Sequence, residues 1–427
     1  MREVFLVQGK RSPLVKSGLD LKDTAAPFLA HYLTRRILDE TLVPDDAVDE
    51  VIIGNIGSPA KYSNVARVVA LEAGLDKKTP AYTVNRNCAA SMEAIAQGSL
   101  RISSGRSEII FAGGVENMGQ IPLYFSKEMT NLFFGLMKAK TLAQKIAVMA
   151  SFRPSFLKPV VAIEQGLTDP FCGLNMGQTA ELIARELGIS REEQDIFANQ
   201  SHHKTVAAKA KHNEDIVPII VGAKLDRLLD SDVGPRADST AEGLGRMKPY
   251  FDRVSGTVTI GNSCPITDGG AMCLLASGDA VKKHNLKPIA RIVNYAFAGL
   301  EPERMGLGPV LAMEQVLRRT ELSLDAMDLV ELNEAFAAQV LACLKILKDD
   351  SLCQKMGLEK AVGEIPLEKL NVNGGAIALG HPVGATGARL IVTLAHELRR
   401  RKLRYGLATL CIGGGQGGAM IIENLCL

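Results

Sequence analysis

The sequence shows no excess of either charge and no long apolar run. Its 49 basic residues are nearly balanced by 47 acidic ones, which gives no reason to expect nucleic acid as a partner. No stretch reaches the roughly 18 consecutive apolar residues of a transmembrane helix. With 427 residues and 47% hydrophobic content, the chain can bury a large core, and its length favours two or three domains.

The cysteines exclude further classes of protein. All eight are scattered, without a CxxC pair or zinc-ligand spacing, which favours a reducing compartment and predicts no metal site. Residues 1–8 are typical of a strand rather than a signal peptide, and the last five residues match neither a peroxisomal nor a prenylation signal. These features favour the bacterial cytoplasm, or the mitochondrial matrix if a leader has been removed.

One cysteine lies where a strand meets a helix. Residues 82–84, with aromatic and β-branched side chains, are typical of the end of a buried strand, and the residues after Cys88 favour a helix. A helix start offers free N–H groups and a positive dipole end, which stabilise a thiolate. We therefore expect a nucleophilic Cys88 with a lowered pKa. The alternative is a small apolar residue that fills a gap.

An internal repeat organises the chain. Residues 37–51 align without gaps to residues 316–330, and both read as a helix, an acidic turn and an Asp-Xaa-Val lead into a strand. Downstream of each, a Val-Asn pair precedes a Gly/Ala-rich helix and a strand that ends in glycines. The chain is therefore predicted to be α/β, with two similar halves. We expect the first half in residues 1–119 and 257–280, an inserted loop domain in 120–256, and the second half in 281–427.

Part of this insertion, residues 126–159, is basic and amphipathic. It carries net charge +5, from six basic residues and Glu128. The basic residues are Lys127, Lys138, Lys140, Lys145, Arg153 and Lys158. Aromatic and aliphatic residues between them favour contact with a membrane surface or a partner subunit. The alternative is a segment folded back onto its own domain.

Two adjacent histidines in the insertion, His202 and His203, fall on a polar helical face. No Asp, Glu or Cys stands at ligand spacing beside them. A solvated surface is therefore predicted for both, rather than a metal site.

Three later segments combine unusual backbone with reactive side chains. Residues 333–336 (NEAF) follow a predicted strand, where open α/β sheets place ligands, although alone they could be a helix N-cap. Residues 371–388 hold five glycines and His381, which lies between Gly and Pro and is a candidate base. The segment lacks the lead-in strand and downstream acid of a dinucleotide site. Residues 411–418 begin with Cys411 and form a glycine cluster that could bind an oxyanion.

Together with Cys88, the segments NEAF, GHP (380–382), CIG (411–413) and MGQTAE (176–181) resemble the thiolase family over nearly the whole chain. The branch most similar is the β-subunit thiolase of the fatty-acid oxidation multienzyme complex. The resemblance implies four catalytic residues, Cys88, His381, Cys411 and Asn333. It implies an oxyanion site of the backbone N–H groups of Cys88 and Gly413. The implied substrate and CoA residues are Met176, Arg236, Phe251, Cys264 and Phe336.

The resemblance also implies a fold and an activity. The fold would be two βαβαβαββ halves in an αβαβα layered core. The activity would be 3-ketoacyl-CoA thiolysis in β-oxidation, through an acyl-enzyme on Cys88, with CoA as substrate and no cofactor or metal. Biosynthetic acetoacetyl-CoA condensation is the alternative. A ketoacyl synthase would need a second histidine where Asn333 stands, and a non-catalytic scaffold would not need all four motifs.

The same resemblance implies partners and shows departures. A homodimer or a dimer of dimers is expected, with an enoyl-CoA hydratase/3-hydroxyacyl-CoA dehydrogenase subunit as a further partner. Four positions differ from the family's common residues: Ala90 replaces Ser, Ser91 replaces Gly, Asn175 replaces His and Cys264 replaces Ser. These differences concern the acyl and CoA pockets rather than the four catalytic positions.

Overall fold

The computed structural model describes residues 2–222, 224 and 226–425. Its N-terminal half is built from alternating strands and helices. These are β1 (Val4–Arg11), α1 (Ala26–Thr41), β3 (Glu50–Gly54), α2 (Val65–Glu72), β4 (Ala81–Val84), α3 (Ala90–Ser103), β5 (Ile109–Glu116) and β10 (Thr267–Ser277). The C-terminal half consists mainly of β11 (Ala290–Gly299), α12 (Gly308–Thr320), β12 (Leu329–Leu332), α13 (Ala337–Leu347), α16 (Thr386–Arg401), β13 (Tyr405–Ile412) and β14 (Gln416–Asn424).

The strands of both halves are hydrogen-bonded in one continuous order, β12-β13-β14-β11-β1-β10-β5-β3-β4. The halves meet where β1 pairs antiparallel with β11, with Val4 opposite Ile292. The short β2 (Val15–Lys16) pairs with β10. Strand β4 lies at one end of this order, and its residues are only half-buried. The expectation that residues 82–84 form a buried strand is therefore wrong, because an edge strand has a neighbour on one side only.

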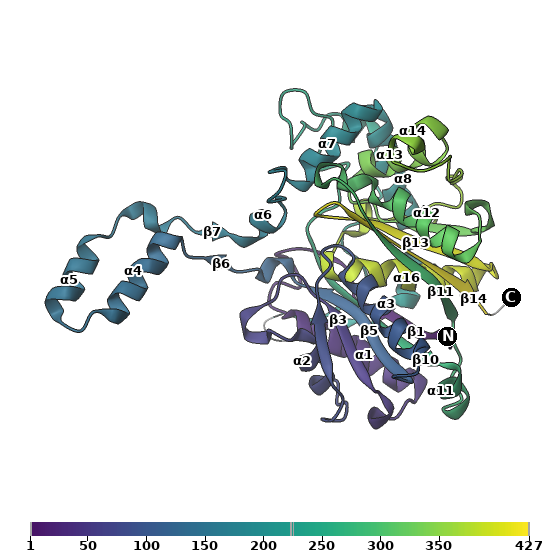
Figure 1. The fold of residues 1–427 in the computed structure, drawn as a ribbon, viewed down its shortest axis with the longest axis horizontal. Coiled ribbons are helices and arrows are strands. Elements are labelled where there is room, and N and C mark those ends of the chain that lie inside the picture. Colours follow the sequence, from purple (N-terminus) through teal and green to yellow (C-terminus); the bar gives the residue numbers. More distant parts are fainter. Residues whose placement is uncertain (1, 223, 225, 426–427) are drawn as a thin grey trace.

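Helices and strands form five layers (Figure 1). One apolar cluster joins α1 and α2 to the N-terminal strands, and another joins α12 and α13 to the C-terminal strands. Between them, α3 and α16 share a third cluster with strands of both halves. The predicted αβαβα core is confirmed. It places the start of α3 and the start of α16 in the middle of the molecule.

The repeat seen in the sequence holds at the level of single hydrogen bonds. Helices α1 and α12 end in left-handed residues at equivalent positions, Leu42 (φ 56°) and Glu321 (φ 57°). Each of the aligned aspartates, Asp49 and Asp328, accepts two backbone N–H groups at the start of the strand next to its own. The two halves are therefore built by the same local chemistry.

The insertion leaves the core between β5 and β10, which pair with each other although about 150 residues separate them. Its first part is an arm of two short strands, β6 (Leu123–Tyr124) and β7 (Val160–Val161), that carry the helices α4 (Lys127–Lys138) and α5 (Leu142–Ala150). Figure 1 shows this arm projecting from the body. The remainder includes α7 (Met176–Leu187), α8 (Arg191–Ala207) and α9 (Lys209–Asp215), which pack on the body.

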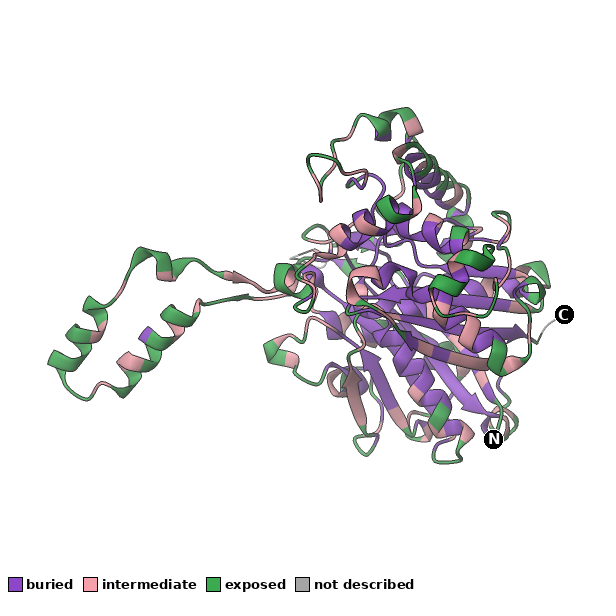
Figure 2. Cartoon of the chain, turned by 45° about the horizontal axis from the view of Figure 1, so that its top comes forward, coloured by how far each residue is buried: buried purple, intermediate pink, exposed green. Residues whose placement is uncertain are grey.

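The two helices of the arm pack on each other and are otherwise open to solvent (Figure 2). Leu132 is the one buried residue of α4, and none of α5 is buried. Met137 is 80% exposed and Leu142 74% exposed. The alternative that residues 126–159 fold back onto their own domain is therefore wrong for this structure. Within the described part of the chain, no helix combines the length and apolarity needed to cross a membrane.

Candidate active site

Cys88 lies in the turn between β4 and α3, two residues before the helix begins, as predicted. The preceding Asn87 has a left-handed backbone (φ 44°), a conformation that Asn tolerates better than most residues. Its side-chain Nδ2 donates to the backbone oxygen of Gly413, at 2.8 Å. The turn of the first half that carries Cys88 is thus bound to the glycine cluster of the second half.

The pKa of Cys88 is raised, because burial disfavours the charged thiolate. Hydrogen bonds from the backbone N–H groups of Gly413 and of Cys88 itself act in the opposite direction and are the weaker effect. The predicted lowering of this pKa is therefore wrong. A resting Cys88 is a neutral thiol, which needs a base to become a nucleophile. The two N–H groups near its sulfur are the ones predicted to bind an oxyanion.

His381 is buried and neutral. Its Nδ1 lies 2.6 Å from Thr386 Oγ1, and that hydroxyl donates to the Pro382 carbonyl at 3.1 Å. Because the hydroxyl proton is used there, the hydrogen on Nδ1 must point to Thr386, which leaves Nε2 as a bare acceptor. Burial, and then the charge of Arg389, lowers the pKa of His381 to about 3. Within the described residues, no direct hydrogen bond joins His381 to Cys88.

Cys411 is the penultimate residue of β13 (Tyr405–Ile412) and is buried. Its pKa is raised well above the ordinary value, first by burial and then by the neighbouring sulfurs of Cys88, Cys343 and Cys264. Burial and Cys88 also raise the pKa of Cys264 to about 12. Cys88, Cys264 and Cys411 therefore gather in one place, where Cys411 keeps its proton. A buried neutral thiol beside the nucleophile can act as a proton donor.

Asn333 and Glu334 follow β12 and are both buried. Both oxygens of Glu334 are occupied, one by Asn371 Nδ2 at 2.9 Å and the other by Ser201 Oγ at 2.6 Å. Glu334 therefore ties the loop together instead of offering a free carboxylate. Asn333 Oδ1 accepts from Arg389 at 3.3 Å, and its Nδ2 has no partner within the described structure.

Four of the predicted substrate residues, Cys264 among them, lie around the sulfurs of Cys88 and Cys411. Met176 begins α7, and its sulfur would be 3.2 Å from a Cβ added at Gly413. Phe251 and Phe336 make an edge-to-face pair with ring centroids 5.8 Å apart. Phe251 also packs on Gly177, where a Cβ would clash with its ring. With Cys264, these side chains form an apolar wall suited to a thioester's acyl group.

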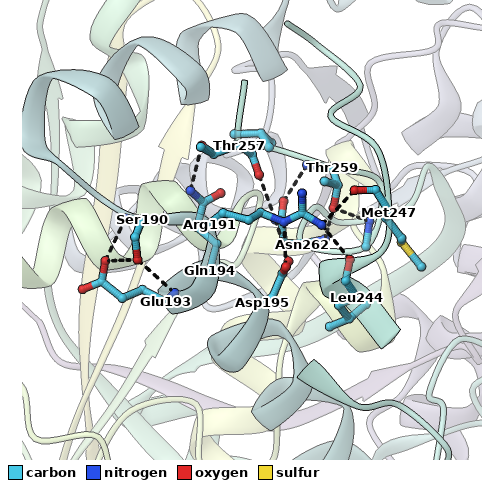
Figure 3. A network of polar contacts seen from close by, with 12 residues as sticks. Ser190, Arg191, Glu193, Gln194, Asp195, Leu244, Met247, Thr257, Thr259 and Asn262 are labelled. Atoms are coloured by element: carbon cyan, nitrogen blue, oxygen red, sulfur yellow. Dashed lines mark hydrogen bonds and ion pairs between the residues drawn. The ribbon is translucent and has the colours of Figure 1, made fainter. Parts of the chain in front are cut away.

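A polar network joins α8 to the segment that precedes Cys264 (Figure 3). Arg191 donates to Asp195 at 2.6 Å, and Asp195 accepts from Asn262 Nδ2 at 3.0 Å. Two residues later, the Cys264 N–H donates to the Ala335 carbonyl at 3.0 Å. The insertion thus connects α8 to the NEAF loop through the segment that carries Cys264.

Arg236 is placed differently from the other predicted substrate residues. It is exposed, and both its backbone N–H and its Nη2 contact the ring of His202, at 3.2 and 3.0 Å. A cavity of about 230 Å³ lies beside it, lined by residues that include Thr205, Lys209 and Pro235. Arg236 is therefore positioned at the periphery of the site.

His202 itself is buried, so the predicted solvated surface is wrong for this residue, whereas His203 is exposed as predicted. Burial, followed by the charge of Arg236, lowers the pKa of His202 to about 4. The signal that could have identified it is helical spacing: His202 lies four residues after the buried Ala198, on the same face. No cluster of three or more His, Cys, Asp or Glu side chains able to hold a metal occurs in the described ranges.

Sequence reasoning missed a residue that connects the two halves. Glu116, at the end of β5, is buried and accepts from the N–H groups of Ile56, Gly57 and Gly384 at 2.9 to 3.2 Å. Gly384 belongs to the loop that carries His381. The sequence signal for Glu116 was its position as an acidic residue at the end of an otherwise apolar strand, because a buried charge must find hydrogen-bond partners.

Two departures from the family's common residues have structural roles. Ser91 Oγ accepts the Ala388 N–H at 2.9 Å, which ties α3 to α16. Asn175 caps α7, with its Oδ1 accepting the Gln178 N–H at 2.9 Å and the Gln178 side chain bonding back.

Comparison with known proteins identifies this arrangement. The family model of the thiolase N-terminal domain matches residues 4–279, and that of the thiolase C-terminal domain matches residues 286–424. The chain is 38% identical to the bovine mitochondrial trifunctional enzyme subunit beta, over 99% of this chain and 88% of that protein. It is 40% identical to an acetyl-CoA acetyltransferase of Pseudomonas aeruginosa, over 99% of this chain and all of the relative.

A solved structure agrees. The human mitochondrial 3-ketoacyl-CoA thiolase in complex with CoA superposes with a TM-score of 0.85 at 38% identity, covering 99% of this chain and 98% of that one. The identity runs through both halves and the insertion, so it concerns the entire site and not one domain. The chain belongs to the thiolase family and is an acyltransferase.

Proposed function

We propose that this enzyme is a 3-ketoacyl-CoA thiolase of fatty-acid β-oxidation. The observation that carries the proposal is Cys411, a buried neutral thiol beside Cys88. We assign the role of base to His381, which is also buried and neutral and whose Nδ1 side is taken by Thr386. Cleaving a carbon–carbon bond next to a ketone needs a base for the nucleophile and an acid for the carbanion. The site offers both, beside the oxyanion donors.

In the first half-reaction, His381 Nε2 takes the Cys88 proton as the sulfur attacks the C3 ketone of the substrate. The backbone N–H groups of Cys88 and Gly413 hold the resulting oxyanion, an interaction often worth about 3 kcal/mol per donor. The C2–C3 bond then breaks and its electrons form the enolate of acetyl-CoA, whose oxygen is held by His381 and, through water, by Asn333. Cys411 donates its proton to C2, and acetyl-CoA leaves.

In the second half-reaction, a CoA thiol replaces the acyl group on Cys88. Cys411, left as a thiolate by the first half-reaction, takes the proton of the CoA thiol as that thiol attacks and forms a second oxyanion in the same two N–H groups. Collapse releases the shortened acyl-CoA, and the protonated His381 returns its proton to the Cys88 sulfur. CoA is thus a substrate, and this sequence of steps uses no cofactor. The structure of a CoA-bound thiolase relative and the cavity beside Arg236 support a CoA site on this side of the insertion.

A second candidate is biosynthetic acetoacetyl-CoA synthesis, the same steps run backwards. The acetyl-CoA acetyltransferase relative from Pseudomonas aeruginosa favours it. Thiolysis measured with 3-ketoacyl-CoA substrates of graded chain length separates the two. A degradative enzyme cleaves chains longer than acetoacetyl-CoA, whereas a biosynthetic one is restricted to acetoacetyl-CoA. The Cys88→Ala variant should be inactive with every substrate, and activity retained by that variant contradicts both candidates.

We propose that the enzyme is a homodimer or a dimer of dimers. Strand β4 ends the sheet with one edge unpaired by another strand of the described chain, and such an edge is suited to a second copy. An obligate interface buries more than about 2,000 Å², so dilution should not release monomers. Light scattering at low micromolar concentration tests this, and a monomer mass would contradict it.

We propose that the arm formed by α4 and α5 binds an anionic membrane. Its net charge of +5 and its exposed apolar residues, such as Met137 and Leu142, are what an anionic bilayer surface attracts. Each lysine near the surface contributes about 1 kcal/mol, and salt weakens the effect. Replacing Lys138, Lys140 and Lys145 with Glu should abolish liposome binding and leave thiolysis of a short substrate unchanged. Absence of liposome binding by the unaltered enzyme at low salt contradicts this role.

We also propose an enoyl-CoA hydratase/3-hydroxyacyl-CoA dehydrogenase subunit as partner, since such an enzyme produces the 3-ketoacyl-CoA substrate. The name of the bovine relative, subunit beta of a trifunctional enzyme, supports this. Binding that is lost on replacing Phe134 and Met137 with Ser, but not on replacing the three lysines, would assign the arm to this partner instead of a membrane. Relatives occur in bacteria and in mitochondria, and we propose the bacterial cytoplasm, or the matrix after removal of a leader.

A further inference from the structure

The centre of the molecule contains a buried arginine that the proposed steps do not use. Arg389, on α16, is 1% exposed. Its Nη2 donates to Asn333 Oδ1 at 3.3 Å, and its Nη1 lies 3.7 Å from Glu331 Oε2. Its Nε and Nη1 make no hydrogen bond in the described structure.

This environment is a poor one for stability alone. A buried charge is compensated only by close, well-made hydrogen bonds, and Arg389 has one long bond and one distant carboxylate. The contrast is Arg11, which is equally buried but makes two bonds of 2.7 and 2.8 Å to Asp232. Arg389 therefore costs stability, and its contact with Asn333 offers a reason to keep it.

The contact determines how the Asn333 amide is oriented. A guanidinium group has only donors, so the amide oxygen must face Arg389 and the amide NH2 must face the opposite way. The backbone of Asn333 is fixed independently, because its N–H donates to the Thr409 carbonyl at 2.9 Å. The outward Nδ2 is buried and without a partner in the described structure, which leaves a donor for a ligand.

We propose that Arg389 is a positioning residue, which holds the Asn333 amide with its NH2 toward the water that binds the substrate enolate. The inference rests on the proposed thiolase reaction, in which Asn333 acts on the enolate through that water and not on acyl transfer. Without Arg389 the amide can rotate and present its oxygen, which draws a hydrogen of the water away from the enolate. Loss of Arg389 should therefore impair carbon–carbon bond cleavage and leave thioester exchange on Cys88 intact.

Two activities of the full-length enzyme separate these steps. Thiolysis of a 3-ketoacyl-CoA requires the enolate, whereas exchange of labelled CoA into an acyl-CoA needs only the acyl-enzyme on Cys88. Arg389→Met should lower the kcat of thiolysis by about 100-fold, the typical cost of one lost donor. The same variant should retain exchange within about threefold. Equal losses in both activities would mean that Arg389 is merely structural and would overturn the inference.

A double-variant cycle tests the route through Asn333. Asn333→Ala should lower thiolysis as Arg389→Met does, and the double variant should be no worse than the poorer single variant. Multiplying losses would show that Arg389 acts independently of Asn333, against the inference. The matched control is Arg11→Met, which removes a buried arginine that does not touch Asn333 and should affect both activities in equal proportion.

A milder variant covers the case in which Arg389→Met does not fold. Arg389→Lys keeps the charge but shortens the reach to Asn333, and should lower thiolysis by about tenfold with exchange unchanged. Wild-type thiolysis in Arg389→Lys, or parallel loss of both activities, would overturn the inference. If the unaltered enzyme catalyses neither thiolysis nor exchange, the proposed function fails; if it catalyses both, only the role of Arg389 is at stake.

Discussion

The two halves of the molecule share a fold but hold their functional loops differently. The first half carries Cys88 in a short turn before α3, and the second carries His381 in a long loop before α16. Each loop is hydrogen-bonded to the other half of the molecule. Asn87 donates to Gly413, and Gly384 donates to Glu116. The site is therefore formed by reciprocal contacts across the repeat.

The longer loop needs additional support, and the insertion supplies it. The Gly375 N–H donates to Ser201 on α8, and the Asn373 carbonyl contacts His212 on α9, at 2.9 Å. No such contact from α8 or α9 reaches the Cys88 turn within the described residues. Of the two loops, the insertion therefore supports the longer one, which carries His381.

The largest effect on turnover is expected when His381, the proposed base, is replaced. His381→Ala should lower turnover by about 1,000-fold, because Cys88 is then a neutral thiol with no group to take its proton. Formation of the acyl-enzyme, followed by stopped-flow or by mass, should slow with it. His203→Ala, an exposed histidine on α8, is the control. Near-normal acylation of His381→Ala would show that the C-terminal loop does not activate Cys88.

The Cys411 thiol should matter for the second proton transfer, the protonation of the acetyl-CoA enolate. Cys411→Ser should lower turnover by about 100-fold, since a hydroxyl does not match a thiol as an acid. The acyl-enzyme on Cys88 should still form slowly. Cys172→Ser, at a partly exposed cysteine outside the site, is the matched control. Unchanged turnover of Cys411→Ser in both directions would make this residue structural.

The hydrogen bonds between the two halves can be weakened by a change in the first half, at Glu116. Glu116→Gln replaces one acceptor oxygen by a donor that faces backbone N–H groups, and should cost about 1–3 kcal/mol of unfolding free energy. Turnover should fall by about tenfold as the His381 loop loosens. Chemical denaturation and steady-state kinetics measure both effects, with Glu72→Gln on the surface of α2 as control. Wild-type turnover in a folded Glu116→Gln enzyme would show that the Glu116 contact does not support the His381 loop.

The smallest effect concerns the support from the insertion and depends on pH. Burial, and then the charge of Arg11, lowers the pKa of His212 to about 4. In the unfolded chain His212 binds a proton more readily than in the folded protein. The contribution of the neutral His212 to folding stability is therefore complete above about pH 6.5 and is lost as the pH falls towards 4. The loss amounts to about 1.4 kcal/mol per pH unit.

His212→Gln keeps a donor for the Asn373 carbonyl and removes the titrating group. The stability advantage of the unaltered enzyme over this variant should therefore shrink between pH 6.5 and 4, as measured by denaturant titration at several pH values. His203→Gln should show no such change. An advantage that is constant with pH would mean that His212 does not stay neutral in the folded protein.

Local pattern was sufficient for much of this architecture. The repeat of residues 37–51 and 316–330, and the strand–turn–helix around Cys88, depend on periodicity and turn chemistry over short distances. The family resemblance, not local pattern, pointed to Met176, Phe251 and Phe336, and the fold brings these side chains together. What short-range pattern encodes is the element and the side chain it offers.

The errors all concern burial, which packing of distant segments decides. Cys88 was expected to have a lowered pKa, but burial raises it. His202 was expected at the surface, but the segment around Arg236 covers it. Glu116 was overlooked, since its partners lie about 60 and 270 residues away in the chain. The neighbouring sequence marks His202 and Glu116 as residues to be buried, but it does not identify the distant segments that bury them.

We propose that Cys88, activated across the repeat by His381, forms an acyl-enzyme while Cys411 protonates the departing acetyl-CoA enolate. Mixing the Cys411→Ser enzyme with a 3-ketoacyl-CoA, quenching with acid and mapping peptides by mass spectrometry tests it directly. The account predicts the shortened acyl group as a thioester on Cys88, absent when His381 is also replaced by Ala. An acyl group on another cysteine, or none at all while acetyl-CoA is still released, would contradict it.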